Sequence, residues 1–193
     1  MAVSRKQSKL VPVAELDTIA HQLSRAAPNC PNYTSLLLQH GDFKEDNLVF
    51  SATEPKIIAI PDWELSTIGE PLCDVVNLSM MYFIPQDKGL GIAGLLGMNL
   101  EDLGLPTRED LLKNYAAYSK LISLPEAKSW FGFYLAFLFF KNCVIVQGVA
   151  QRAKAGVASS AIADRVADLL PTLIAMTNQM LREYPPPTLS SSL

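Results

Sequence analysis

Cysteine and histidine are both scarce in this chain, which has three cysteines and two histidines among 193 residues. The cysteines, Cys30, Cys73 and Cys143, are far apart and odd in number, a pattern that gives neither a disulfide framework nor a zinc site. We therefore expect reduced thiols in an intracellular protein. Cys73 lies beside Asp74, but no second histidine lies in this region, so Cys73 is interpreted as a packed thiol.

Charge is also limited, with 18% charged residues and a net charge of −3. Nucleic acids and anionic membranes are bound by basic surfaces, so we expect neither as a partner. Apolar residues make up 49% of the chain, which excludes a disordered protein and favours one compact core.

Membrane and targeting signals are weak. The apolar stretch 130–149 contains Lys141 and Asn142 near its middle, where a bilayer would penalise each by about 2–3 kcal/mol. We therefore expect a buried helix and no membrane span. The basic N-terminus is followed by no apolar segment, and the terminal Ser-Ser-Leu differs from the peroxisomal Ser-Lys-Leu signal. The expected location is cytoplasmic, with the peroxisome as the alternative.

The apolar pattern predicts a mainly helical α+β protein with one polar β-hairpin. Two short β-type runs, 48–50 and 57–60, flank a turn that contains Pro55 and predict the hairpin. Pro171 should kink or break the last helix. Helices are predicted over 13–27, from 74 to 81, near 108–120, over 131–154 and over 159–183.

Polar side chains gather in two segments, 40–47 (HGDFKEDN) and 61–64 (PDWE). Asn47 enters the first strand of the hairpin and Asp62 leaves the second, so antiparallel pairing brings them to the same open end. Asp42 lies on the loop that leads there. Ordinary turn residues are the alternative interpretation, because Asp and Asn favour turns.

This set of groups suits phosphoryl transfer. A carboxylate and an amide oxygen are suitable ligands for Mg²⁺, which keeps several waters and binds phosphate oxygens. A further carboxylate that is not a ligand can accept the proton of an attacking hydroxyl. The pattern therefore matches the division of labour in kinases, where a base precedes an asparagine and a later aspartate holds metal.

The segment HGDFKEDN resembles the kinase catalytic-loop pattern H-x-D-x-x-x-x-N, and PDWE stands where protein kinases carry Asp-Phe-Gly. HGD…DNLVF followed by AIPDWELSTIGEPLCDV is most similar to the aminoglycoside and choline-kinase-like phosphotransferases. Together with FYLAFLFFKNCVIVQGVAQRAKAGVASS, it resembles the subgroup found alone or fused to acyl-CoA dehydrogenases. The resemblance covers about residues 33–183.

Site roles follow from this resemblance. It implies that Asp42 is the catalytic base, that Asn47 and Asp62 bind Mg²⁺, and that ATP is the co-substrate. Lys44 stands where protein kinases place a lysine that faces the transferred phosphate.

Supporting roles are implied as well. Asp74 resembles the family aspartate that braces the catalytic loop, and His40 is interpreted as a brace rather than a base. Glu64 either supports the metal or pairs with a nearby helix. Pro61 replaces the expected aliphatic residue and removes one N–H donor at the end of the strand.

The resemblance also implies the C-terminal lobe of a protein-kinase-like fold over 33–183, with the catalytic hairpin in 40–65. An N-terminal helix and linker are expected over 1–32, and a flexible tail over 184–193. Two-lobed kinases hold nucleotide in a sheet with a Gly-rich turn. No glycine precedes Gly41, so no nucleotide-binding loop is recognised and the N-terminal lobe is expected to be absent.

Three functional interpretations follow. The first is a small-molecule kinase, incomplete alone, that phosphorylates a substrate hydroxyl. The second is a catalytically inactive pseudoenzyme or binding module, and the third is other metal-assisted chemistry such as hydrolysis. The apolar face left by the absent lobe predicts self-association or a partner chain. The acyl-CoA-dehydrogenase-linked subgroup suggests an acyl-chain hydroxy acid or its thioester as acceptor.

Overall fold

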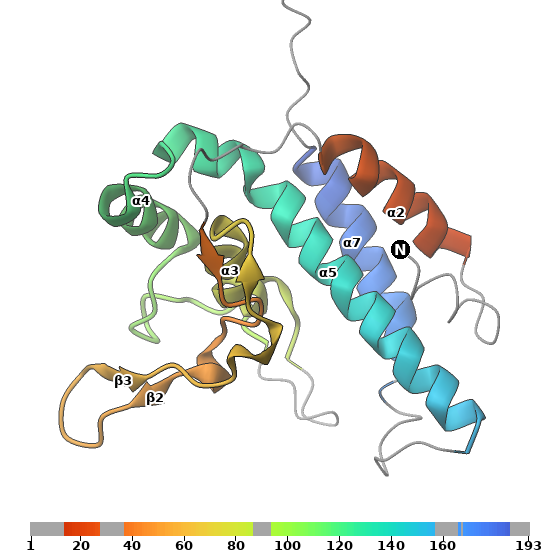
Figure 1. Ribbon diagram of the computed structural model, residues 1–193, viewed down its shortest axis with the longest axis horizontal. Helices are drawn as coiled ribbons and strands as arrows, with labels where there is room; N and C mark the ends of the chain where they lie inside the picture. Colours follow the sequence, from red (N-terminus) through yellow and green to blue (C-terminus); the bar gives the residue numbers. More distant parts are fainter. Residues whose placement is uncertain (1–13, 28–36, 87–93, 157–165, 167, 186–193) are drawn as a thin grey trace, which may run out of the picture. The chain divides into compact units, whose positions relative to one another are not determined.

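A computed structural model of the chain describes residues 14–27, 37–86, 94–156, 166 and 168–185. Helices dominate, and the strands are two or three residues long (Figure 1). In chain order the elements are α2 (Ala14–Ala26), β1 (Leu38–Gln39), η2 (Glu45–Asn47), β2 (Val49–Phe50), β3 (Ile57–Ala59), η3 (Trp63–Leu65), β4 (Thr67–Ile68), α3 (Leu72–Leu78), η4 (Met80–Phe83), α4 (Arg108–Ser119), α5 (Leu124–Lys154) and α7 (Leu170–Glu183).

The chain divides into two compact units, and the boundary falls inside α5. Unit 1 comprises residues 1–30 and 132–193, and unit 2 comprises residues 31–131. The chemistry-bearing segments 40–47 and 61–64 both belong to unit 2. Each unit is described below by itself.

Unit 1 is helical in its described part. The helix predicted over 13–27 is confirmed as α2, and it packs against α7 (Figure 1). Its buried face comprises Leu16, Ile19, Ala20, Leu23 and Ala26. Leu16 also joins a core cluster with Cys143, Val146 and Leu170. The apolar spacing in the sequence therefore marked the face that is buried.

The long apolar helix α5 begins seven residues before the predicted start, at Leu124. In the described part of the chain it alone is long and apolar enough to cross a membrane, and 61% of its most apolar window is buried inside the structure. Such burial is what a core helix requires. Pro171 lies in the first turn of α7, where its missing N–H costs no helical hydrogen bond.

Unit 2 is built around the short helix α3, which packs against α4. Its residues Leu72 and Val76 are fully buried. Thr107 is the N-cap of α4, where it accepts a hydrogen bond from the Asp110 N–H and the Asp110 side chain accepts one from Thr107. α3 begins two residues before the predicted start, after Pro71, a position that proline's fixed φ favours.

Two small antiparallel sheets carry the loops of unit 2. β1 pairs with β4, so that Leu38 lies opposite Ile68. β2 pairs with β3, so that Val49 lies opposite Ala59, with an irregular register next to it. The second pair confirms the predicted hairpin (Figure 1).

The β2–β3 ribbon has exposed apolar side chains on both faces. Adjacent residues of a strand point to opposite faces, yet Val49 and Phe50 are 42% and 59% exposed, and Ile57 and Ile58 are 46% and 58% exposed. A two-stranded ribbon is marginally stable by itself. The ribbon is thus an unusually apolar piece of exposed surface.

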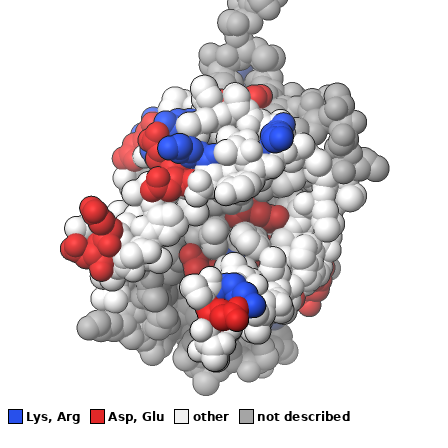
Figure 2. Space-filling model, turned by 90° about the vertical axis from the view of Figure 1, so that its left-hand side faces the viewer, with Lys and Arg blue, Asp and Glu red and all other residues white. Residues whose placement is uncertain are grey.

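Charge is mixed on the face drawn in Figure 2, where Lys and Arg side chains lie beside Asp and Glu side chains with uncharged surface between them. Two ion pairs outside the site, Lys56–Glu54 and Lys128–Glu109, join exposed groups. Exposed pairs of this kind contribute little to stability.

Candidate phosphoryl-transfer site

The loop formed by residues 40–47, called the 40–47 loop below, is held by one carboxylate. Asp74, in the first turn of α3, accepts a hydrogen bond from the His40 N–H at 2.6 Å through Oδ2 and one from the Gly41 N–H at 3.0 Å through Oδ1. Two N–H groups are thereby bound by a charged acceptor, which makes strong hydrogen bonds. The structure places Asp74 where the resemblance implied a brace.

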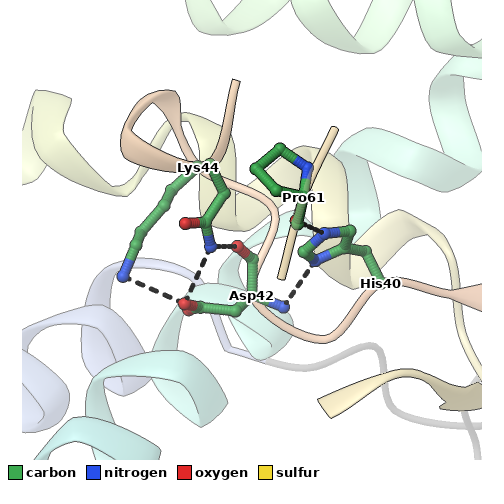
Figure 3. Close-up of polar contacts among 5 residues, drawn as sticks. His40, Asp42, Lys44 and Pro61 are labelled. Atoms are coloured by element: carbon green, nitrogen blue, oxygen red, sulfur yellow. Dashed lines mark hydrogen bonds and ion pairs between the residues drawn. The ribbon is translucent and has the colours of Figure 1, made fainter. Parts of the chain in front are cut away.

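Asp42 and Lys44 meet at one point of this loop (Figure 3), and Asn47 contacts Asp42 there. The Asn47 Nδ2 group donates to the Asp42 backbone carbonyl at 2.8 Å and to Asp42 Oδ2 at 3.1 Å. Lys44 Nζ lies 3.0 Å from the same Oδ2. Asn47 is buried and the Asp42 side chain is 25% exposed. Because the amide nitrogen of Asn47 faces Asp42, any metal bound by Asn47 would be bound through Oδ1.

His40 joins two loops (Figure 3). Its Nδ1 accepts a hydrogen bond from the Asp42 N–H at 3.3 Å, and its Nε2 lies 2.9 Å from the carbonyl oxygen of Pro61. His40 is 3% exposed. Both ring nitrogens are occupied by the backbone, so the geometry suits a brace better than a general base.

Asp62 follows Pro61 and caps η3, the first turn after β3. Its backbone is left-handed, with φ 69° and ψ 51°, a conformation uncommon for residues other than glycine. The Asp62 side chain is exposed and makes no capping hydrogen bond. The His40–Pro61 contact ties the residue before Asp62 to the 40–47 loop.

The remaining candidates divide clearly. Glu64 is exposed. Cys73 is buried, as expected for a packed thiol. Burial raises the pKa of Tyr115 in α4 to about 12, and the carboxylates of Glu70 and Asp74 contribute to the rise.

Two residues with structural importance were missed by the sequence reasoning. Gly41 has φ 85°, and a Cβ placed there would overlap the carbonyl oxygen of Leu65. Trp63 packs its ring against His40 with 4.6 Å between centroids. The position of Gly41 between two predicted site residues was the available signal for the first. For Trp63, the signal was its place directly after Asp62.

The proposed donors are of types that suit Mg²⁺. Asn47 Oδ1 and the Asp62 carboxylate are hard oxygen donors, and a magnesium site would need only one or two protein carboxylates. The described residues contain no cluster of three or more His, Cys, Asp and Glu side chains arranged to hold a metal.

Comparison with known proteins agrees with this chemistry. Residues 2–111 match the model of a family described as the phosphotransferase enzyme family. The chain is 35% identical over 178 residues to rat acyl-CoA dehydrogenase family member 11, a match that covers 90% of this chain and 22% of that protein. It is 32% identical over 160 residues to mouse acyl-CoA dehydrogenase family member 10, covering 83% of this chain and 14% of that protein.

A solved structure is similar along most of the chain. It is a protein of Ralstonia eutropha, provisionally named an aminoglycoside phosphotransferase, with a TM-score of 0.73 and 29% sequence identity. The match covers 93% of this chain and 53% of that one. The mostly helical fold with small antiparallel sheets is thus the fold of an aminoglycoside phosphotransferase, matched over about half of its length.

The contacts of Asp74 lead to a prediction about stability. Replacing Asp74 by Ala should lower the free energy of unfolding by about 1.5–3 kcal/mol, because two N–H groups lose a charged acceptor. Asp74→Asn should also destabilise, since its amide group would set a donor against one N–H. Urea unfolding measures both, with the exposed Asp102→Ala as control. Values within about 0.5 kcal/mol of that control would contradict the bracing role.

Proposed function

The chain belongs to the phosphotransferase enzyme family, and we propose that it is the catalytic part of an ATP- and Mg²⁺-dependent small-molecule kinase. The observation that carries this proposal is the contact of Asn47 Nδ2 with the carboxylate and carbonyl of Asp42. This contact places Asp42, the proposed base, beside Asn47, whose amide oxygen is a proposed metal ligand. Both lie in a loop that Asp74 braces. Phosphoryl transfer needs such positioning more than it needs covalent chemistry.

In the proposed reaction an acceptor hydroxyl attacks the γ-phosphorus of ATP. The new O–P bond forms as the bond from phosphorus to the β–γ bridging oxygen breaks, and the hydroxyl proton passes to Asp42. The products are ADP and a phosphate ester. Lys44, 3.0 Å from Asp42 Oδ2, would leave this partner to face the transferred phosphate.

Asn47 and Asp62 would hold Mg²⁺ in this proposal. The ion supplies charge neutralisation for the phosphate oxygens when bound. Asn47 contributes Oδ1 because its nitrogen is used by Asp42. Asp62 contributes an exposed carboxylate, which suits a site that opens towards a phosphate chain.

The acceptor is proposed to be a hydroxylated acyl compound, either an acyl-chain hydroxy acid or its thioester. Support comes from relatives named as acyl-CoA dehydrogenase family members. The chain spans only 14–22% of the length of these two relatives. The proposed class of acceptor therefore rests on the names of proteins much longer than this chain. A panel of hydroxyacyl thioesters and free hydroxy acids would be the first substrates.

The alternative is a binding module or pseudoenzyme that keeps the site without transferring phosphate. Residues 1–40 contain no glycine, and so no Gly-rich loop of the kind that covers the phosphates in kinases. Nucleotide binding separates the two interpretations.

Magnesium-dependent ATP binding is the first prediction of this proposal. Calorimetry should show micromolar binding to the wild type and its loss in Asp62→Asn, because the neutral amide removes the charged metal ligand. Asp46→Asn, an exposed acid of the same loop, should bind as the wild type does. Glu64→Gln decides whether Glu64 supports the metal. No binding at millimolar ATP would contradict the proposal for this chain alone and favour the alternative.

Catalysis provides a separate prediction. Asp42→Asn should lower kcat for phosphate transfer by about 10²- to 10⁴-fold, since the general base is lost. Mg²⁺·ATP affinity should stay near the wild-type value, because Asp42 is not assigned as a ligand. The assay follows ADP release with the hydroxyacyl panel. An Asp42→Asn rate equal to that of the Asp46→Asn control would refute the assignment.

Association is a further expectation of this proposal. The apolar β2–β3 ribbon should be covered by a second copy or a partner chain, because an exposed ribbon with apolar faces tends to be buried. Light scattering should give a mass above that of one chain, and Phe50→Ser with Ile58→Ser should lower it. Tyr118→Ser, at an 87% exposed position on α4, is the control. A monomer at high concentration would contradict self-association.

A further inference from the structure

Two polar side chains of unit 2 have buried atoms that no other group satisfies. Asn77 lies on α3 and Tyr115 on α4, and these two helices pack against each other (Figure 1). Asn77 is 6% exposed, and its Nδ2 has no hydrogen-bond partner in the described part of the chain. The buried hydroxyl oxygen of Tyr115 has none there either. A buried polar atom without a partner destabilises the fold, so each of the two requires an explanation.

Asn77 shares a helix face with the carboxylate that holds the 40–47 loop. Asp74 and Asn77 are three residues apart in α3, and Glu70 lies four residues before Asp74, in the turn that leads into this helix. Residues three or four apart lie on the same side of a helix. One side of α3 and its entry turn therefore carries two carboxylates and a buried amide.

Tyr115 lies on the buried side of α4, three residues after Leu112, which is 1% exposed. Burial is the main cause that raises the Tyr115 pKa to about 12, and the charges of Glu70 and Asp74 add to the rise. Ser119, one turn further along α4, offsets part of it, but does not reach hydrogen-bond geometry with the hydroxyl. Tyr115 is thus a protonated donor at ordinary pH, within electrostatic range of both carboxylates.

One water molecule would satisfy these groups together. Asn77 Nδ2 and the Tyr115 hydroxyl both donate, and a water oxygen can accept two hydrogen bonds. The hydrogens of the water then need acceptors, and a carboxylate keeps free lone pairs after each of its oxygens has accepted one N–H. Buried waters typically make about three hydrogen bonds to groups that have no other partner.

We propose that Asn77 and Tyr115 hold one buried water molecule between α3 and α4, and that this water positions Asp74. Both side chains donate to the water, which donates in turn to the carboxylates of Glu70 and Asp74. The Asp74 carboxylate is then oriented by this water as well as by the two N–H groups of the 40–47 loop. The proposal concerns contacts within unit 2 and is independent of phosphate transfer by this chain.

A high-resolution crystal structure of the chain is the first test. It should show an ordered water within about 3.2 Å of both Asn77 Nδ2 and the Tyr115 hydroxyl oxygen. In the Tyr115→Phe variant this water should be lost or displaced. Protein partners for both atoms, or a dry contact between the two helices, would overturn the proposal.

Urea unfolding gives an independent test. If Asn77 has no partner at all, an apolar side chain of similar size removes an unpaired group, and Asn77→Leu should raise the unfolding midpoint. If Asn77 binds water, Asn77→Leu should lower the midpoint, and so should Tyr115→Phe. Asn114→Leu, at an exposed position of α4, measures the effect of helix propensity alone. Tyr118→Phe, at an 87% exposed position of the same helix, is the control for the tyrosine. Midpoints at or above those of the controls would contradict a bound water.

The double variant tests whether the two side chains share the water. Either single change should already release it, so Asn77→Leu with Tyr115→Phe should lower the midpoint by less than the sum of the single changes. A fully additive double variant would show two independent groups and refute a shared water.

The effect on the 40–47 loop has its own measurement, hydrogen exchange followed by nuclear magnetic resonance. The Gly41 N–H donates to Asp74, and it should exchange several-fold faster in Tyr115→Phe than in the wild type. The N–H groups of α2, in unit 1, should keep their rates, which a general loss of stability would not allow. An unchanged Gly41 rate in Tyr115→Phe would refute the positioning of Asp74.

Discussion

The site depends on one interaction, the pair of hydrogen bonds that Asp74 accepts from the His40 and Gly41 N–H groups. They fix the start of the 40–47 loop on the first turn of α3, whose residues Leu72 and Val76 are fully buried. The next contacts follow in sequence. The Asp42 N–H donates a hydrogen bond to His40, and the Asn47 side chain donates one to Asp42. A carboxylate in a supporting position thus decides where the carboxylate proposed to react will lie.

Polar groups in this site are shared between structure and chemistry. Asn47 uses its nitrogen to hold Asp42 and keeps Oδ1 as the atom suited to a metal. His40 uses both ring nitrogens for the backbone, which explains why a conspicuous histidine beside an aspartate is here a brace. Asp42 and Lys44 are more exposed than these supports. This arrangement is expected where a substrate must reach the reacting groups while their supports stay fixed.

The comparisons and the site geometry point in the same direction from independent observations. The family match and the similar solved structure give the fold and the class of chemistry. The contacts around Asp42 give each residue a physical task. The chain spans 53% of the similar solved structure. The proposal on nucleotide binding and the proposal on a partner for the apolar ribbon are therefore related. Both depend on what else meets unit 2.

The sequence by itself determined the helices with a strong apolar period, such as α2, the hairpin around Pro55, and the choice of Asp42, Asn47 and Asp62 as the residues proposed for the site. Those features are local, because spacing and residue type are enough to specify them. Only the tertiary structure decided that His40 contacts Pro61 and Trp63, and that Gly41 lies against Leu65. These pairs are more than twenty residues apart. Their geometry depends on how two loops pack, and no period in the sequence records that packing.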